Sequence, residues 1–298
     1  MKRRSFIKLS SCILAGGLLP LTTTSQASVS KQRPLIMGIF PRRNIKLTYQ
    51  IFTPMARYLS NELGREVKLI TAKNFKQFWL GVKEQRYDLV HYNQYHYIIS
   101  HLLYDYQVIL KNQEFGQSTV AGSIVVRKDS GIDKVSDLEN KTILFGGGKM
   151  AMQSYIAAKW LLKQGGLNSK DYQEKFSINP PNAIMSTFRK QADAAGSGDV
   201  VIRLDVVKSS IDVSQMKYLA RTRQLTHLPW AVKHDMEYDL KLKIQLALSS
   251  LNTEPAGQKI LDQAKLSSLI PATDSEYNGH REIIQEVYGK DYGIEKFK

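Results

Sequence analysis

Short apolar runs that fit buried strands alternate with longer segments that fit amphipathic helices along most of this chain. The strands that this pattern predicts in the first half are 35–40, 67–70, 88–90 and 108–110. The helices predicted between them are 51–63, 75–82 and 95–104. Gly64 directly follows the first helical pattern, as is typical of a helix end. This strand–helix order predicts a parallel sheet with helices on both faces.

The same alternation restarts after Gly122. The strands predicted there are 123–127, 142–145 and 192–195, and the helices are 135–138, 150–164 and 182–191. After about residue 220 a helical pattern returns, with Leu240, Ile244, Leu248 and Leu251 on one face. Open α/β sheets bind ligands beyond the carboxyl ends of their strands, so two facing sheets predict a ligand-binding cleft.

The first 27 residues have the three-part layout of a secretory signal. A positive start, Met1–Arg4, precedes an apolar run, Cys12–Leu19, that is shorter than the roughly 20 residues needed to cross a bilayer. Ser25-Gln26-Ala27 fits a cleavage site near Ala27. Arg3–Lys8 resembles a twin-arginine export motif, and an ordinary Sec signal with two arginines is the alternative. The sequence therefore predicts an exported, periplasmic protein.

The position of the single cysteine excludes cysteine-based sites from the predicted mature chain. Cys12 is the single cysteine and lies inside the predicted signal, so the mature chain has neither disulfides nor cysteine-based metal sites or nucleophiles. Leu9–Cys12 matches a lipobox in letters, but the apolar run mostly follows this cysteine, which argues against a lipoprotein.

The charge of the chain is strongly positive. The net charge is +15, and the four basic residues of the predicted signal leave 15 − 4 = +11 for the mature chain. The basic residues are scattered without a tract of five, and export also argues against a nucleic-acid partner. Such a surplus can attract a small anion, whereas most individual lysines fit a solvated surface. No other stretch is apolar enough to embed the chain in a membrane.

A glycine-rich segment, Gly146-Gly147-Gly148-Lys149, lies between a predicted strand and a predicted helix. Glycines let backbone amides approach a ligand, and a helix N-terminus favours negative charge. The segment therefore fits either an anion site or a tight turn with Lys149 in solvent. A nucleotide P-loop is excluded, because Ile143 and Met150 stand where that motif needs Gly and Ser or Thr.

Polar and aromatic residues follow the third predicted strand. Tyr92 and Asn93 are predicted ligand contacts, since they combine hydrogen-bonding groups with a ring that excludes solvent. For Tyr95 and Tyr97, packing is an equal alternative. His91 and His96, five residues apart without nearby carboxylates, make poor metal ligands, and no metal is expected.

Three further residues have two alternative roles each. Trp230 either lines the pocket or packs in the core. Arg42 and Arg43 follow the first strand and either reach an anion or lie in a solvated loop.

Four segments together resemble one family. They are Pro54–Gly64, Tyr87–Tyr92, Val135–Lys141 and Lys190–Ala195. Their order and spacing are similar to those of the phosphate, phosphite and phosphonate-binding (PhnD-like) proteins of ABC transporters, over nearly the whole mature chain. The resemblance implies an α/β fold of the type II periplasmic-binding class, with two lobes of mixed, mainly parallel sheets joined by two hinge strands. It places lobe I at 32–120 and 222–298, and lobe II at 121–221.

The chain also departs from this family. The Ser-Thr-Ser-Gly sequence that holds the phosphonate oxygens in the family falls here near Ala151-Met152-Gln153-Ser154. The family's ligand-facing histidine falls near Pro180-Pro181-Asn182, whereas Tyr92 matches its closing tyrosine. The predicted ligand-binding residues are Tyr92, Asn93, Gly147, Gly148, Lys149, Gln153, Ser154, Asn182 and Trp230. Phosphonate as the ligand does not follow from them.

The predicted function is a monomeric periplasmic protein that captures a small anion for an ABC permease, without cofactor or catalytic residues. A sensor kinase as the membrane partner is the alternative. An exported enzyme is a third reading, disfavoured because the sequence has no Ser-His-Asp signature, paired-carboxylate motif or mature cysteine.

Overall fold

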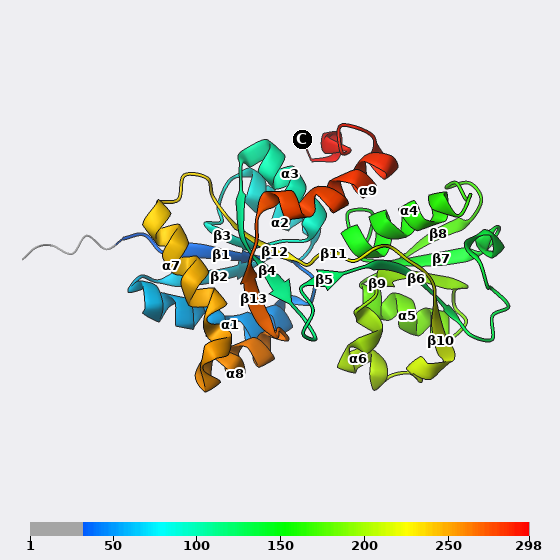
Figure 1. The fold of residues 1–298 in the computed structure, drawn as a ribbon, viewed down its shortest axis with the longest axis horizontal. Helices are drawn as coiled ribbons and strands as arrows, with labels where there is room; N and C mark the ends of the chain where they lie inside the picture. The colour runs from blue at the N-terminus through cyan, green and yellow to red at the C-terminus, as the bar shows by residue number, and fades with distance from the viewer. Residues whose placement is uncertain (1–31, 298) are drawn as a thin grey trace, which may run out of the picture. The chain divides into compact units, whose positions relative to one another are not determined.

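A computed structural model describes residues 32–297, and the chain from Arg33 onward packs as one compact unit with two large sheets (Figure 1). The predicted signal, its twin-arginine motif and its cleavage site lie outside the described residues. Within the described range, no helix has the length and apolar character needed to cross a membrane.

The first sheet has six strands in the order β13-β4-β12-β3-β1-β2. Its strands are β1 (Leu35–Ile39), β2 (Val67–Thr71), β3 (Leu89–His91), β4 (Gln107–Gln113), β12 (Pro229–Val232) and β13 (Ser268–Pro271). The helices of this lobe are α1 (Ile45–Leu63), α2 (Phe75–Lys83), α3 (Gln94–Tyr104), α7 (Tyr238–Ser249), α8 (Pro255–Ala264) and α9 (Asn278–Tyr288). The four strands predicted for the first half are all present.

The first four strands, β1 to β4, all run in the same direction, as the prediction of a parallel sheet requires. β1 pairs in parallel with β2 and β3, and β4 runs the same way. β4 does not pair with them, however, because β12 inserts between β3 and β4 in the opposite direction. β12 follows the strands of the second sheet in the sequence, so the chain returns to the first sheet to insert it.

The second sheet has five strands in the order β10-β6-β9-β7-β8. Its strands are β6 (Gly122–Arg127), β7 (Thr142–Gly146), β8 (Gln173–Ser177), β9 (Ala194–Gly198) and β10 (Met216–Arg221). The helices of this lobe are α4 (Ala157–Gln164), α5 (Pro180–Phe188) and α6 (Asp205–Lys208). β7 pairs in parallel with β8 and β9, whereas β6 runs antiparallel to both of its neighbours.

Two short strands join the lobes. β5 (Thr119–Val120) and β11 (Leu225–Thr226) pair antiparallel with each other and belong to neither large sheet. The mixed, two-lobed α/β fold is therefore as predicted, while the residue limits of each lobe stay a prediction.

The helix predicted at 150–164 begins differently in the structure. A π-helical turn, Met152–Ile156, precedes α4, and Tyr155 and Ile156 both donate their amides to the carbonyl of Ala151. This turn packs directly on β9, because a Cβ added to Gly196 would lie 2.3 Å from the carbonyl oxygen of Ser154. β9 extends to Gly198, three residues beyond the strand predicted at 192–195.

The C-terminal helix α9 contacts both lobes (Figure 1). From the second lobe, Lys163 donates to the carbonyl of Glu286 at 2.9 Å. The Gln153 amide nitrogen lies 3.2 Å from the Nε2 of His280 on the same helix. Movement of the lobes must therefore break or carry along these contacts.

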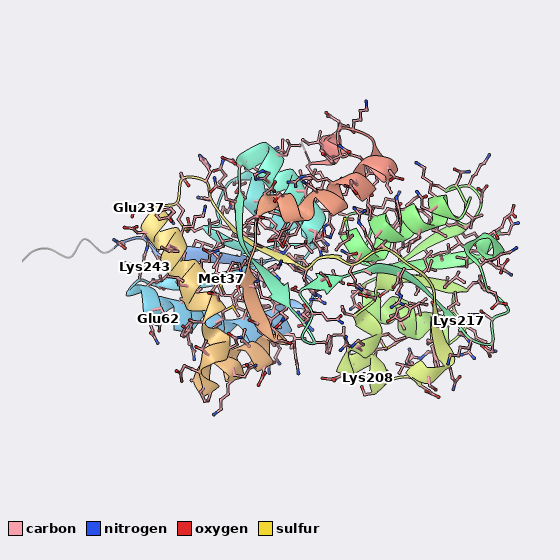
Figure 2. The ribbon with its side chains drawn as sticks, in the orientation of Figure 1. Met37, Glu62, Lys208, Lys217, Glu237 and Lys243 are labelled. Carbon is pink, nitrogen blue, oxygen red and sulfur yellow. The ribbon has the colours of Figure 1, made fainter. Side chains whose placement is uncertain are left out.

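Several charged side chains lie on the outside of each lobe. Figure 2 labels Glu62, Lys208, Lys217, Glu237 and Lys243 at the periphery, whereas Met37 lies in the core of the first lobe and is fully buried. The scattered lysines at these positions fit the solvated surface expected from the sequence.

Candidate functional site

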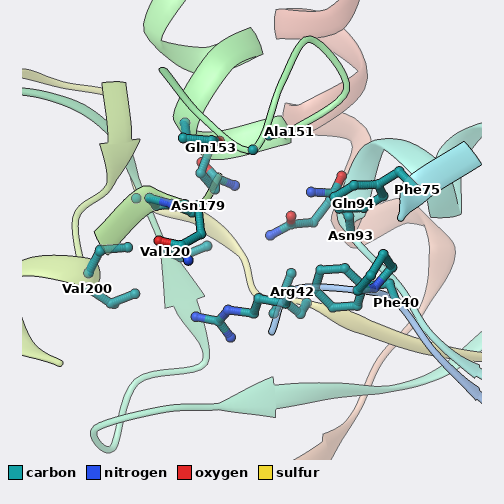
Figure 3. A pocket seen from close by; sticks show the side chains of 18 of the residues that line it. Phe40, Arg42, Phe75, Asn93, Gln94, Val120, Ala151, Gln153, Asn179 and Val200 are labelled. Atoms are coloured by element: carbon teal, nitrogen blue, oxygen red, sulfur yellow. The ribbon is translucent and has the colours of Figure 1, made fainter. Parts of the chain in front are cut away.

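A cavity of about 100 Å³ lies between the two lobes, at the carboxyl ends of strands from both large sheets. Phe40 follows β1, Asn93 lies two residues after β3, Gly146 ends β7, Ile178 follows β8, and Gly198 ends β9. Figure 3 shows the side chains of Phe40, Phe75, Asn93 and Gln94 on one side and those of Val120, Gln153, Asn179 and Val200 on the other.

Three helical segments begin at this cavity. Asn93 caps α3, its Oδ1 accepting from the amide of Tyr95 at 3.0 Å. Asn179 caps α5, its Oδ1 accepting from the amide of Asn182 at 3.0 Å. The π-helical turn before α4 begins at Ala151. Helix N-termini carry partial positive charge, so the three together favour a negative group in the cavity.

The two capping asparagines also present unused donors. Each uses its side-chain oxygen for the cap, and across residues 32–297 neither side-chain nitrogen, Nδ2 of Asn93 or Nδ2 of Asn179, has a hydrogen-bond partner. Both residues line the cavity, one from each lobe. Neutral donors of this kind can hold an anion at a smaller desolvation cost than a buried charge.

Arg42 is the one charged side chain, among the residues that the structure describes, that lines the cavity. Its two terminal nitrogens donate to the two carboxylate oxygens of Glu114, at 2.6 and 3.3 Å. Burial alone would raise the pKa of Glu114, but the charges of Arg42 and its neighbours outweigh burial and hold that pKa below its ordinary range. Arg42 is therefore charge-compensated before any ligand arrives.

His227 lines the cavity beside this pair and is 1% exposed. Its Nδ1 accepts from the amide of Leu228 at 2.8 Å, so the neutral ring carries its proton on Nε2. That Nε2 lies 3.9 Å from a Glu114 oxygen and lacks a hydrogen bond within the described residues. Burial lowers the pKa of His227 to about 4, against the attraction of Glu114, so the ring is neutral at pH 7.

Four of the predicted site residues line the cavity, namely Asn93, Gly147, Gln153 and Ser154. The Ser154 hydroxyl is engaged with the carbonyl of Gly146, which fixes the turn after β7. Gln153 lies near His280, and its Oε1 is buried without a partner among the described residues. Whether these residues contact a ligand stays a prediction.

Tyr92 and Trp230 do not line the cavity. Tyr92 is fully buried, with its ring centroid 5.8 Å from that of Phe78. Trp230 is also fully buried, stacks on His91 at 4.4 Å and donates from Nε1 to the Asn112 Oδ1 at 2.8 Å. Both aromatic side chains therefore pack in the core, in two different hydrophobic clusters, Tyr92 beside Tyr106 and Trp230 beside Phe52.

Gly148, Lys149 and Asn182 also lie outside the cavity lining. Lys149 is exposed, and its carbonyl accepts from the hydroxyl of Tyr288 at 2.6 Å. Gly148 and Gly147 both have φ near +89°, which a tight turn with glycine adopts without strain. Asn182 lies inside α5, because that helix begins two residues earlier than predicted, with Pro180 as its first residue.

The sequence reading missed several lining residues, and the signal for one of them was present. Asn179 directly precedes two prolines, and an N-cap residue followed by proline is a typical helix start. Gln94 and Ile178 carry no such signal. Of the two alternatives for Arg42, an anion contact or a solvated loop, the structure shows neither outright: Arg42 lies at the cavity with its charge paired to Glu114.

Histidines are buried in this lobe without forming a metal site. His91 and His96 are buried, and neither ring has a hydrogen bond within the described residues. The described part of the chain contains no group of three His, Cys, Asp or Glu residues placed to hold a metal.

Comparison with known proteins gives a family match and several similar folds. The sequence model of the family described as the periplasmic substrate-binding protein of phosphonate ABC transporters matches residues 37–277. The structure of PhnD1 from Prochlorococcus marinus, solved with methylphosphonate, has a TM-score of 0.74 at 19% identity, covering 86% of this chain and 98% of that one.

Two further structures are similar. A binding protein of an ABC phosphonate transporter from Pseudomonas aeruginosa has a TM-score of 0.74 at 15% identity, covering 88% of this chain and 89% of that one. The aliphatic sulphonate-binding protein SsuA from Escherichia coli has a TM-score of 0.61 at 14% identity, covering 88% and 94%. At these identities the structural likeness establishes the fold alone.

Proposed function

Because the chain belongs to the family of periplasmic substrate-binding proteins of phosphonate ABC transporters, we propose that it captures a small oxyanion of the phosphonate, phosphite or phosphate type between its lobes. The oxyanion is then presented to an ABC permease. The protein acts in the periplasm after removal of a signal that ends near Ala27. A membrane sensor kinase is the alternative partner for the same liganded form.

The observation that carries this proposal is the convergence of three helical N-termini on one cavity. The N-termini of α3, of the π-helical turn and of α5 all lie at its wall. A helix N-terminus stabilises a nearby anion by typically 0.3–1 kcal/mol, up to about 2 kcal/mol where it is partly buried. These termini, together with the unpaired side-chain nitrogens of Asn93 and Asn179, support binding of an oxyanion that several donors contact at once.

Ligand capture proceeds by movement of the lobes about the β5–β11 pair. The cavity has donors from both lobes, so a bound oxyanion contacts more groups when the lobes approach each other. The ligand shifts the population towards the closed form by the difference between its affinities for the two forms.

A binding role fits this cavity better than catalysis. Among the described lining residues there is no carboxylate, and the single hydroxyl, that of Ser154, is engaged with the carbonyl of Gly146. A nucleophile with an adjacent base is what covalent catalysis needs. The matched family and the similar structures reported above are also binding proteins.

The test is calorimetric titration of the mature protein with phosphate, phosphite, methylphosphonate, a sulfonate and a carboxylate, with a polyamine as the cationic control. The decisive variant is Asn179→Asp, because aspartate retains the cap of α5 but places a negative charge at the cavity. We expect it to weaken oxyanion binding at least tenfold, about 1.4 kcal/mol or more, through charge repulsion.

Asn44→Asp is the matched control. Asn44 caps α1 with the same geometry, at 2.9 Å, but is exposed and does not line the cavity. This variant should retain the affinity within about twofold, since the added charge lies at a solvated position. The proposal is contradicted if the polyamine binds and no oxyanion does. It is also contradicted if Asn179→Asp binds the oxyanion as tightly as the wild type.

A further inference from the structure

The first-lobe wall of the cavity is aromatic. Phe40 and Phe75 both line it, with ring centroids 6.1 Å apart. Phe75 stacks on His96, with a centroid distance of 4.9 Å and an interplanar angle of 17°. Burial lowers the pKa of His96 to about 3, so the ring is neutral and supports Phe75 as an apolar platform.

The second-lobe wall is aliphatic. Val200 and Val201 are buried beside the cavity, whereas Ile178, in the loop between β8 and α5, is 87% exposed. Such exposure leaves nearly a whole isoleucine side chain in water at the edge of a binding site. A ligand with an apolar group, covered by this side chain, would remove that surface from water.

The described residues that line the cavity offer no counter-charge to a cationic ligand group. No carboxylate occurs among its described lining residues. Glu114, next to Arg42, has both oxygens bonded to the guanidinium, and one also accepts from the Asn112 amide at 3.2 Å. An ammonium group in this cavity would lose its hydration without gaining an ionic partner, which is costly.

From these two apolar walls and the absence of a free carboxylate, we propose that the solute is an organic oxyanion whose acidic head carries a short, uncharged apolar substituent. The head lies at the helix N-termini, and the substituent lies between Phe75 and Ile178. The cavity of about 100 Å³ suits a small solute whose substituent has a few carbon atoms. This inference rests on the proposed function, since it presupposes an oxyanion in the cavity.

The test is titration of the mature protein with phosphate and with methyl-, ethyl- and propylphosphonate. The affinity should rise about fourfold for each methylene group that the cavity accommodates. The sharpest pair is propylphosphonate and 2-aminoethylphosphonate, which have nearly the same shape but differ in a terminal methyl or ammonium group. We expect the aminoethyl compound to bind at least tenfold more weakly.

Ile178→Asn tests the aliphatic wall without disturbing the core, because the side chain is exposed. It should lower the ratio of propylphosphonate affinity to phosphate affinity about fivefold to tenfold. Val206→Asn, at a position of the second lobe that is 52% exposed and outside the cavity, is the matched control and should leave this ratio unchanged.

The two proposals fail in different ways. Equal affinity for phosphate and the alkylphosphonates, or an aminoethyl compound that binds as well as its propyl counterpart, overturns the inference and leaves oxyanion capture standing. Absence of binding by every phosphonate and by phosphate overturns oxyanion capture itself, and with it the inference.

Discussion

The two walls of the cavity are built in different ways. The first-lobe wall consists of large side chains, such as Phe40, Phe75 and Gln94, held by a buried aromatic core. The second-lobe wall has Gly146, Gly147 and Gly198 among its residues. These glycines permit close backbone packing, because a Cβ on Gly146 would lie 2.3 Å from the Cα of Pro180 and the Gly147 amide donates to the carbonyl of Ser177. Substitution of a tightly packed glycine should therefore disturb the fold, whereas substitution of a side chain that lines the cavity should change ligand binding.

The largest expected effect lies in the second lobe. Gly196→Ala places a Cβ 2.3 Å from the carbonyl oxygen of Ser154 and 2.6 Å from the ring of Phe145. Neither neighbour can move without shifting the π-helical turn or the core, so we expect a loss of more than about 3 kcal/mol in the free energy of unfolding, measured by urea denaturation.

Gly198→Ala is the control in the same strand. An added Cβ there meets its neighbours at 3.6 Å or more, an ordinary contact distance. The stability should change by less than about 1 kcal/mol. If both variants lost the same free energy of unfolding, the close contact between Gly196 and the π-helical turn would not be the cause of the loss.

A smaller effect concerns His227, where the chain re-enters the first lobe. Its folded-state pKa of about 4 lies below the ordinary value of 6.5, so the unfolded chain binds more protons between these values. The contribution of this group to stability is fully present well above pH 6.5 and is lost as the pH falls towards 4. The expected loss between pH 8 and pH 5 is about 2 kcal/mol.

The measurement is urea denaturation across this pH range for the wild type and His227→Gln. The variant should lack about 2 kcal/mol of the wild-type decrease. His234→Gln, at an exposed position outside the cavity, is the control and should follow the wild-type profile. Parallel pH profiles for the wild type and His227→Gln would refute the assignment of a buried neutral ring.

The smallest expected effect concerns Tyr92 and tests whether its side chain belongs to the core or contacts the ligand. Its hydroxyl is buried and has no hydrogen bond within the described residues, so Tyr92→Phe removes an unsatisfied polar group. The variant should be as stable as the wild type or up to about 1 kcal/mol more stable. Oxyanion affinity should stay within twofold in calorimetric titration. A tenfold loss of affinity would mean that Tyr92 reaches the ligand when the lobes close, as the family resemblance implied.

Local sequence signals predicted most of the fold. Buried apolar runs located β1 to β4, and Gly64 ends α1 with its amide bonded to the carbonyl of Asn61. β8 was missed because this edge strand, Gln173–Ser177, is largely polar and half exposed, without apolar alternation. The insertion of β12 between β3 and β4 depends on contacts between distant segments, which local patterns do not encode.

The site was harder to predict than the fold, for a physical reason. An aromatic residue after a strand fits a ligand wall and a core equally well, and the choice for Tyr92 and Trp230 depends on which space their rings fill. The prediction of Asn182 lies three residues from the lining residue Asn179, because the two prolines after Asn179 start α5 earlier than the apolar pattern indicates. The partnership of Arg42 with Glu114 joins residues 72 positions apart.

The most direct measurement is a crystal structure of the mature protein with propylphosphonate bound. We expect the phosphonate oxygens to accept hydrogen bonds from amides at the N-termini of α3 and the π-helical turn and from the Nδ2 of Asn179, since Pro180 and Pro181 leave α5 without a free amide, and we expect the propyl group to lie between Phe75 and Ile178. A phosphonate held outside this cavity by surface lysines, or one bound in it with the propyl group at the helix N-termini, would contradict the account.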